Sequence, residues 1–207
     1  MRDPLPEIVS VAACGPSALK CGAARAPGYV IAVNDAYRHV RHDAVLSMDG
    51  RWLEHRVSEG GLVAPLYARR TAWSKAGFAP SLAGGKDEVG GYGVRATLFE
   101  CDNNSDVFGD NELQLNGPNS GYCALNLAYV LRPRVVYLFG FDHSGGHFHP
   151  ESEWRKRGEG CANTPRKFAS WSASCYVARD MFDTRKIKVI NTNRESCVRA
   201  FEFGDSP

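Results

Sequence analysis

Residues 119–142 read NSGYCALNLAYVLRPRVVYLFGFD, and this stretch decides the fold of the chain. The polar pair at its start suits a helix N-cap, because such side chains accept hydrogen bonds from the free amides of a first turn. A helical apolar face follows, and Arg132 and Pro133 end the helix. Val135–Phe139 is then a continuous apolar run of strand length, which is typical of a parallel strand covered on both faces.

The rest of the chain continues this alternation of strand and helix in both directions. Apolar runs of strand length occur at Ile8–Ala13, Tyr29–Val33, Ala44–Met48, Leu62–Pro65, Val94–Glu100 and Lys188–Ile190. Helical segments are expected at Ala18–Ala24, Arg51–Ser58 and Arg166–Phe182, with a last turn near Ser196–Phe201. Strands that alternate with helices indicate a parallel sheet. We expect residues 1–207 to form a single Rossmann-like α/β domain, with a mainly parallel sheet and helices on both faces.

Composition and charge argue against two classes of protein. The 25 Lys and Arg residues nearly balance the 23 Asp and Glu residues, so nothing predicts a surface that binds nucleic acid. No run of about 20 apolar residues is present to span a membrane. The first residues, MRDPLPE, lack the apolar stretch of a signal peptide, and the seven cysteines form no Cys-x-x-Cys pair. We therefore expect a cytoplasmic protein with reduced, structural cysteines.

One long segment lacks the periodicity of a helix or a strand. Residues 143–165 are rich in glycine, charge and aromatic side chains, and we predict that they form a mobile lid loop. Trp154 in this loop is the tryptophan best placed to close over a ligand, beside Arg155 and Lys156. Trp171, in the next predicted helix, is interpreted as a core residue.

Polar side chains or tight turns follow five of the predicted strands. They are Cys14–Ser17, Asn34-Asp35, Asp49, Asp142 and Asn191. The carboxyl ends of parallel strands meet at one edge of a sheet, so these residues are expected to share one crevice. Capping alone explains any one of them. Their convergence predicts a ligand pocket, with Asn34, Asp49 and Asp142 in its wall.

Two turns have the features of an anion site. Glycine allows close backbone approach, and proline suits the first helical position, so the amides that follow are expected to point outward. These features occur at Gly15, Pro16 and Ser17, and a second helix start lies at Asn119, Ser120 and Gly121. Ordinary capping explains either turn alone. Together they predict positions for two phosphates, or for a phosphate and a carboxylate.

Histidines cluster directly after the apolar Val135–Phe139 run. His143, His147 and His149, with Asp142 and Glu151, offer metal-ligand chemistry, but a Gly-Gly pair interrupts any helical spacing. A bound metal, a catalytic histidine and a solvated loop all stay open as interpretations. We take the three histidines as catalytic candidates and predict no metal site.

Four short motifs occur in the order seen in bacterial sialyltransferases of the Campylobacter type. They are Cys14-Gly15-Pro16-Ser17, Asn34-Asp35-Ala36-Tyr37, Asn119-Ser120-Gly121-Tyr122 and Val136–Asp142. The chain resembles this family over most of its length, as short motifs separated by dissimilar sequence. The resemblance extends to uncharacterised phage and prophage proteins, and more loosely to archaeal-type hydroxymethylpterin diphosphokinases.

The resemblance implies a Rossmann-like domain that binds a cytidine nucleotide-sugar (a CMP-sugar) without a metal cofactor. It also implies contacts for each motif: Gly15, Pro16 and Ser17 with phosphate, Asn34 with the sugar or phosphate groups, Asn119, Ser120 and Gly121 along the donor cleft, and Asp142 near the ribose or base. A tyrosine of the family is Ser144 here, and no histidine stands near Ala162-Asn163, where the family has its catalytic one. Since transfer needs a base for the acceptor hydroxyl, His143, His147 and His149 are the predicted substitutes.

These observations predict a nucleotide or nucleotide-sugar binding protein of the glycosyltransferase type, with a small-molecule partner. Two alternatives stay open. One is Mg²⁺-dependent pyrophosphoryl transfer to a pterin-like alcohol, with the metal held by Asp49 and Asp142. The other is a binding or interaction protein that retains the fold without catalysis. A homo-oligomer is compatible with each of them.

Overall fold

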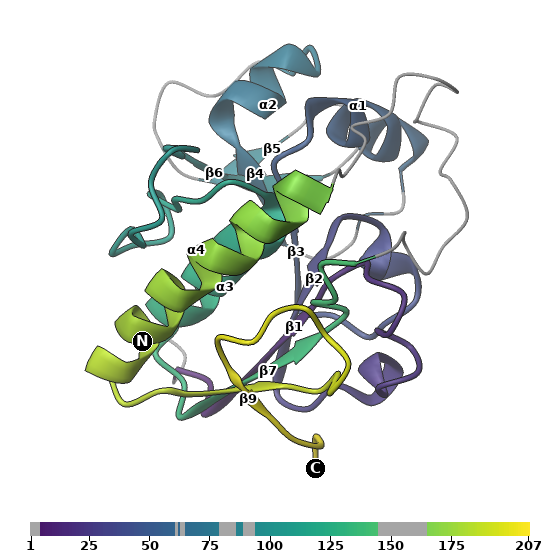
Figure 1. Cartoon of the computed structure of the whole chain (residues 1–207). Coiled ribbons are helices and arrows are strands. Elements are labelled where there is room, and N and C mark those ends of the chain that lie inside the picture. Colours follow the sequence, from purple (N-terminus) through teal and green to yellow (C-terminus); the bar gives the residue numbers. More distant parts are fainter. Residues whose placement is uncertain (1–4, 61, 63–64, 79–85, 89–93, 145–164) are drawn as a thin grey trace.

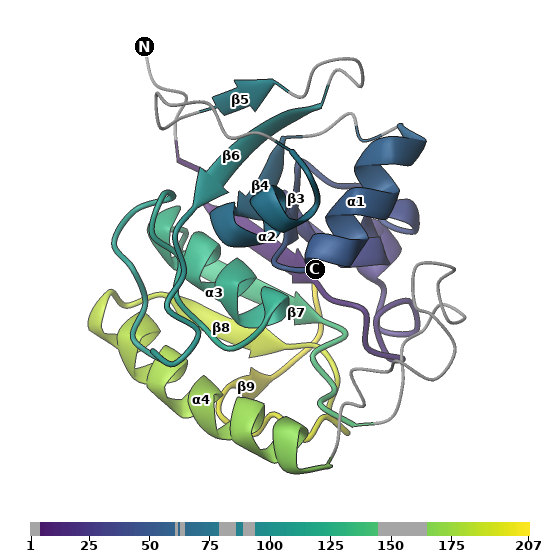
Figure 2. The same cartoon turned by 90° about the horizontal axis from the view of Figure 1, so that it is seen from above.

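The computed structural model describes residues 5–60, 62, 65–78, 86–88, 94–144 and 165–207. Within these residues nine strands form one sheet, in the order β5-β6-β4-β3-β2-β1-β7-β8-β9 (Figures 1 and 2). The strands are β1 (Ile8–Ala12), β2 (Tyr29–Val33), β3 (Ala44–Ser47), β4 (Leu66–Arg69), β5 (Lys86–Glu88), β6 (Arg95–Phe99), β7 (Val135–Phe139), β8 (Lys188–Asn191) and β9 (Glu202–Phe203). All neighbouring pairs are parallel except β5 with β6.

Helices cover both faces of this sheet, as expected. They are α1 (Gly50–Glu59), α2 (Arg70–Lys75), α3 (Ser120–Val130) and α4 (Pro165–Thr184), with 3-10 helices η1 (Ala23–Arg25) and η2 (Asn34–Arg38). Side chains alternate along each strand, so β2 sends Ile31 into the core beneath α3 and α4, and Ala32 into the opposite core beside η1 and η2. Figure 1 shows α3 and α4 running side by side across one face. The Rossmann-like α/β prediction is confirmed in its architecture.

The strand order places a crevice beside β1. The chain runs outward from β1 through β2, β3 and β4 to β6, and then returns through α3 to β7 on the other side of β1. In open parallel sheets, ligands bind at the carboxyl edge where the strand order reverses in this way. β7 coincides with the predicted apolar run Val135–Phe139 and is flanked by β1 and β8.

Three local predictions were wrong or incomplete. The strand predicted at Leu62–Pro65 lies at Leu66–Arg69 instead, because proline has no amide to donate and the strand begins after it. The helix predicted over Ala18–Ala24 is a series of turns that ends in η1, since Gly22 has a φ of 86°. The short helix α2 was not predicted. The lid loop predicted for residues 143–165 lies, from residue 145 to 164, outside the described residues.

Glycine is required where the exits of β1 and β7 approach each other. A Cβ on Gly15 would lie 2.2 Å from both the Gly140 carbonyl oxygen and the Asp142 carboxylate. Gly140 itself has a φ of 70°, which side-chain-bearing residues rarely adopt. The two glycines therefore allow the ends of the two central strands to touch.

A buried ion pair fixes η2 against α1. Asp35 accepts hydrogen bonds from Arg56 Nε at 2.8 Å and from Trp52 Nε1 at 2.9 Å. The Asp35 and Arg56 side chains are 3% and 4% exposed. Charges buried this deeply are stable only when they are paired and hydrogen-bonded. The pair holds the end of β2, where Asn34 lies, in a defined position.

We expect Arg56→Met to lower the free energy of unfolding by about 3–5 kcal/mol, because it leaves the Asp35 carboxylate buried without its cation. Urea denaturation at pH 7.5 measures the change. Glu59→Gln is the control, since Glu59 is 43% exposed and its ion pair with Arg56 contributes about 1 kcal/mol at most. A double variant that adds Asp35→Asn should recover part of the loss. Equal destabilisation by Arg56→Met and Glu59→Gln would contradict this account.

Candidate functional site

A cavity of about 500 Å³ opens at the carboxyl edge of the parallel strands. Of the predicted site residues, Gly15, Asn34, Asp49, Asn119, Ser120, Gly121, Asp142 and His143 line it. Pro16 and Ser17 lie beside it, outside the lining. His147 and His149 lie outside the described residues, as do Trp154, Arg155 and Lys156. The structure thus brings together polar groups from strand exits that are far apart in the sequence.

Asp142 connects three of these exits rather than pointing a free carboxylate at the cavity. It is 3% exposed, and its Oδ2 accepts a hydrogen bond from the Ser17 amide at 3.0 Å. Its Oδ1 accepts from the side-chain amide of Asn193, and its backbone carbonyl accepts from the Cys197 amide at 2.9 Å. The carboxylate therefore joins the ends of β1, β7 and β8.

The first turn does not offer the free amides that the sequence predicted. The Gly15 amide donates to the Gly140 carbonyl at 3.1 Å, and the Ser17 amide donates to Asp142. Pro16 has no amide hydrogen. The amides of this turn therefore hold β1 against β7 and are not available to a ligand. One binds the Gly140 carbonyl where the two strands meet, and the other binds the buried Asp142 carboxylate.

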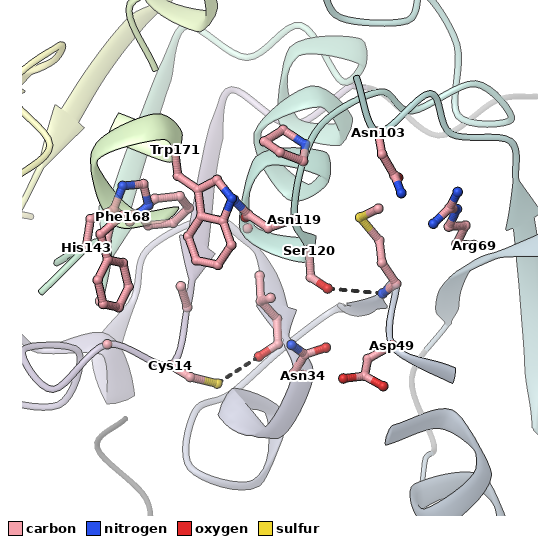
Figure 3. Close-up of a pocket in the computed structure, with 18 of the residues that line it drawn as sticks. Cys14, Asn34, Asp49, Arg69, Asn103, Asn119, Ser120, His143, Phe168 and Trp171 are labelled. Carbon is pink, nitrogen blue, oxygen red and sulfur yellow. Dashed lines mark hydrogen bonds between the residues drawn. The ribbon is translucent and has the colours of Figure 1, made fainter. Parts of the chain in front are cut away.

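The second helix start is open. Asn119 caps α3 by accepting from the Tyr122 amide at 2.9 Å, and the Ser120 hydroxyl accepts from the Met48 amide at 3.1 Å (Figure 3). No described residue accepts a hydrogen bond from the amides of Ser120 and Gly121, and both residues line the cavity. Free first-turn amides at the positive end of a helix dipole attract anions.

Asn34 lines the same cavity and carries a side-chain carbonyl oxygen without a hydrogen-bond partner in the described part of the chain. This oxygen, Oδ1, is buried. Its backbone adopts a φ of 49°, in the left-handed region, which asparagine tolerates better than most residues with a side chain. Asp49 has instead the capping role that sequence alone allowed, since its Oδ1 accepts from the amides of Arg51 and Trp52.

Aromatic side chains form one end of the cavity and cations lie at the other. Figure 3 shows His143, Phe168 and Trp171 on one side, and Arg69 and Asn103 on the opposite side. The His143 ring stacks on Phe168 with centroids 6.3 Å apart, and its edge contact with Trp171 spans 6.1 Å. The prediction that Trp171 is a core residue was therefore wrong, because it is half-buried in the cavity wall.

The cationic end was missed by sequence analysis. Arg69 lies at the exit of β4, and its Nε is buried without a hydrogen-bond partner among the described residues. Lys75, from α2, also lines the cavity. No described residue forms an ion pair with either cation. Because this strand was predicted at Leu62–Pro65, Arg69 was not recognised as a residue at the carboxyl end of a strand.

His143 is uncharged at neutral pH. Burial lowers its pKa to about 4, against a smaller opposing effect of the nearby Asp142 charge. Its Nδ1 lies 3.0 Å from the Ser172 hydroxyl of α4, so this bond fixes the ring and leaves Nε2 for other partners. A neutral imidazole can accept a proton, although a pKa of about 4 makes His143 a weaker base than an ordinary histidine.

No cluster of three or more His, Cys, Asp or Glu side chains within the described ranges could hold a metal ion. Asp49 and Asp142, the predicted Mg²⁺ ligands of one alternative, each accept hydrogen bonds from backbone amides. In the same part of the chain, none of the helices has both the length and the apolar character needed to cross a membrane.

We expect His143→Asn to reduce the loss of unfolding free energy on acidification. Asparagine is chosen because it tolerates the φ of 49° at this position. Below the ordinary histidine pKa of 6.5 the unfolded chain takes up a proton, while folded His143 stays neutral until about pH 4. Acidification to pH 5 therefore costs the native protein about 2 kcal/mol through this residue. Urea denaturation at pH 7.5 and pH 5 measures the difference.

The His143 variant should lose about 2 kcal/mol less stability between the two pH values than the native chain. Equal losses in the two proteins would show that burial does not keep His143 neutral.

Comparison with solved structures relates this fold to a characterised enzyme. The sialyltransferase CstII from Campylobacter jejuni, solved in complex with the substrate analogue CMP-3FNeuAc, superposes with a TM-score of 0.55 and 15% sequence identity. The match covers 97% of this chain and 86% of CstII. No protein-family model and no curated protein sequence matches the chain. At this level of identity the comparison establishes the fold: the chain has the Rossmann-like α/β architecture of CstII.

Proposed function

We propose that the cavity binds a nucleotide-sugar, with a cytidine nucleotide as the leading candidate, and that the protein acts as a glycosyltransferase. The observation that carries the proposal is a pair of first-turn amides without an acceptor among the described residues, at Ser120 and Gly121, which line a cavity of about 500 Å³. A cavity of this size suits a ligand of nucleotide-sugar dimensions. The complex of CstII with CMP-3FNeuAc supports the choice of nucleotide, since the two folds match along most of their length.

In this proposal the phosphate lies at the start of α3. The two amides donate to its oxygens, and the helix dipole favours its negative charge. Arg69 and Lys75, which also line the cavity, supply positive charge. Stabilisation of the departing phosphate then comes from preoriented amides and cations, which is the largest contribution in many transfer reactions.

The remaining parts of the ligand fit the two other features of the cavity. The flat apolar faces of Phe168 and Trp171 suit a sugar ring at the aromatic end, which places the transferred sugar beside His143. Asn34 lines the cavity and its buried Oδ1 lacks a donor among the described residues, which a sugar hydroxyl group supplies once the side chain turns toward the ligand. Binding would complete a hydrogen bond that the free protein lacks.

Transfer also needs a group that takes the proton from the acceptor hydroxyl. Of the described residues that line the cavity, one is a histidine, His143. Its neutral ring is held by Ser172, and Nε2 can accept a proton if Nδ1 donates to that hydroxyl. We therefore assign His143 as the base, with His147 and His149 as the other predicted candidates.

The proposed phosphate site predicts that the protein binds CMP more tightly than cytidine, because only CMP has a phosphate that the α3 amides can bind. We expect the Kd of CMP to be about tenfold lower or better, measured by isothermal titration calorimetry. Arg69→Gln should weaken CMP by about tenfold, the size expected for a charged hydrogen bond, and leave cytidine unaffected.

Arg70→Gln is the matched control, since Arg70 pairs with Glu100 at 2.8 Å and does not line the cavity. It should change the Kd of CMP less than twofold. Equal affinity for CMP and cytidine, or no binding of either at millimolar concentration, would refute the phosphate site at α3.

The catalytic step predicts that His143→Asn slows transfer without weakening the nucleotide. With CMP-NeuAc as donor and a galactoside as acceptor, CMP release should fall about 100-fold, as expected for the loss of a general base. The Kd of CMP should change less than threefold. Unchanged release would exclude His143 as the base and favour His147 or His149, each tested by the same substitution.

A further inference from the structure

Two cysteines from different elements meet beside the cavity. Cys101 follows β6, and Cys123 lies near the start of α3. Their Sγ atoms are 3.7 Å apart. Cys123 is fully buried, whereas Cys101 is partly exposed. Of the six cysteines in the described residues, this is the pair whose sulfurs contact each other.

We propose that Cys101 and Cys123 form a reversible disulfide that clamps the loop after β6 to α3 when the protein meets a hydroperoxide. The Cys101 thiolate attacks one oxygen of the peroxide, and the O–O bond breaks. The attacked oxygen stays on sulfur as the sulfenic acid, and the other oxygen takes up a proton and leaves as water or an alcohol. The Cys123 sulfur then attacks the Cys101 sulfur and loses its proton, and water leaves. Two thiols are oxidised and one peroxide is reduced, and a thiol reductant reverses the reaction.

The surroundings of the two sulfurs assign these roles. The pKa of Cys101 is lowered, first by its hydrogen bond with Cys123 and also by the positive charge of Arg69. Burial raises the pKa of Cys123 well above its ordinary value. The more exposed thiol is thus also the one that ionises more readily, which is the pattern of an attacking cysteine.

The clamp would act on the cavity wall. The Cys101 sulfur lies 3.4 Å from Asn103 Oδ1 and 3.6 Å from the Gly117 carbonyl oxygen. Asn103 and Pro118, next to Gly117, line the cavity. A disulfide has an S–S distance of about 2.05 Å, so the two sulfurs must approach by about 1.6 Å from their present 3.7 Å. Such a movement changes the position of Asn103 relative to the start of α3.

The experiment oxidises the whole protein with a small excess of hydrogen peroxide and follows it by mass spectrometry. The intact mass should fall by about 2 Da, the two hydrogens lost with one disulfide. Residues 102–122 contain no lysine or arginine but several acidic residues, so an endoprotease that cleaves at acidic residues separates the two cysteines. The two fragments should stay joined until a thiol reductant is added.

Cys101→Ser and Cys123→Ala should each abolish the joined fragments, and Cys21→Ser and Cys197→Ser should not. Cys101→Ser provides the safer test of folding, since that residue is partly exposed. Closing this loop should raise the Tm by about 5–10 °C, reversibly. Joined fragments from any other pair, or a gain of oxygen mass at Cys101 without the joined fragments, would overturn the proposal.

The effect on the cavity rests on the proposed function, whereas disulfide formation does not. The Kd of CMP should differ at least threefold between oxidised and reduced protein, and the difference should vanish in Cys101→Ser. If the fragments are joined and the Kd is unchanged, the clamp does not control the cavity. If reduced protein binds no nucleotide, the proposed function fails while the mass result still tests the disulfide.

Discussion

The buried carboxylate of Asp142 is the constraint on which the geometry of this site depends. It accepts hydrogen bonds from the Ser17 amide and from the Asn193 side chain, and these donors come from the segments after β1 and β8. A carboxylate at 3% exposure is costly unless such donors surround it. The close contact of Gly15 with Gly140 and Asp142 follows from this requirement, since any side chain at Gly15 would enter the space that the carboxylate occupies.

This constraint divides the polar strand exits into two groups. The amides of Gly15 and Ser17 serve the protein itself, because they bind Gly140 and Asp142. The amides of Ser120 and Gly121 at the start of α3 have no hydrogen-bond acceptor among the described residues. The first group holds the edge of the sheet in place, and the second belongs to residues that line the cavity. Under the proposed function, the fold therefore keeps these donors in position before any ligand arrives.

Sequence patterns predicted the parts of the fold that depend on neighbouring residues. The run Val135–Phe139 and the Asn119 cap of α3 lie where they were expected, because their apolar and capping signals are local. Residues whose role depends on distant partners were harder to interpret. The bond between Ser17 and Asp142 joins positions 125 residues apart, and no local pattern shows that it consumes the amide. Arg69 was missed because the strand was predicted to end at Pro65, whereas it begins after this proline and ends at Arg69.

Asn34 shows why an unfavourable local arrangement bears on function. Its unsatisfied buried oxygen costs about 1–3 kcal/mol, whereas its left-handed backbone is a conformation that asparagine adopts more readily than other residues with a side chain. The neighbouring Asp35, anchored by Arg56 and Trp52, holds this arrangement in place. A core selected for stability alone would not keep this cost, since glycine at this position would remove it. The proposed function explains the asparagine, because a ligand hydroxyl in the adjacent cavity completes the missing hydrogen bond once the side chain turns toward it.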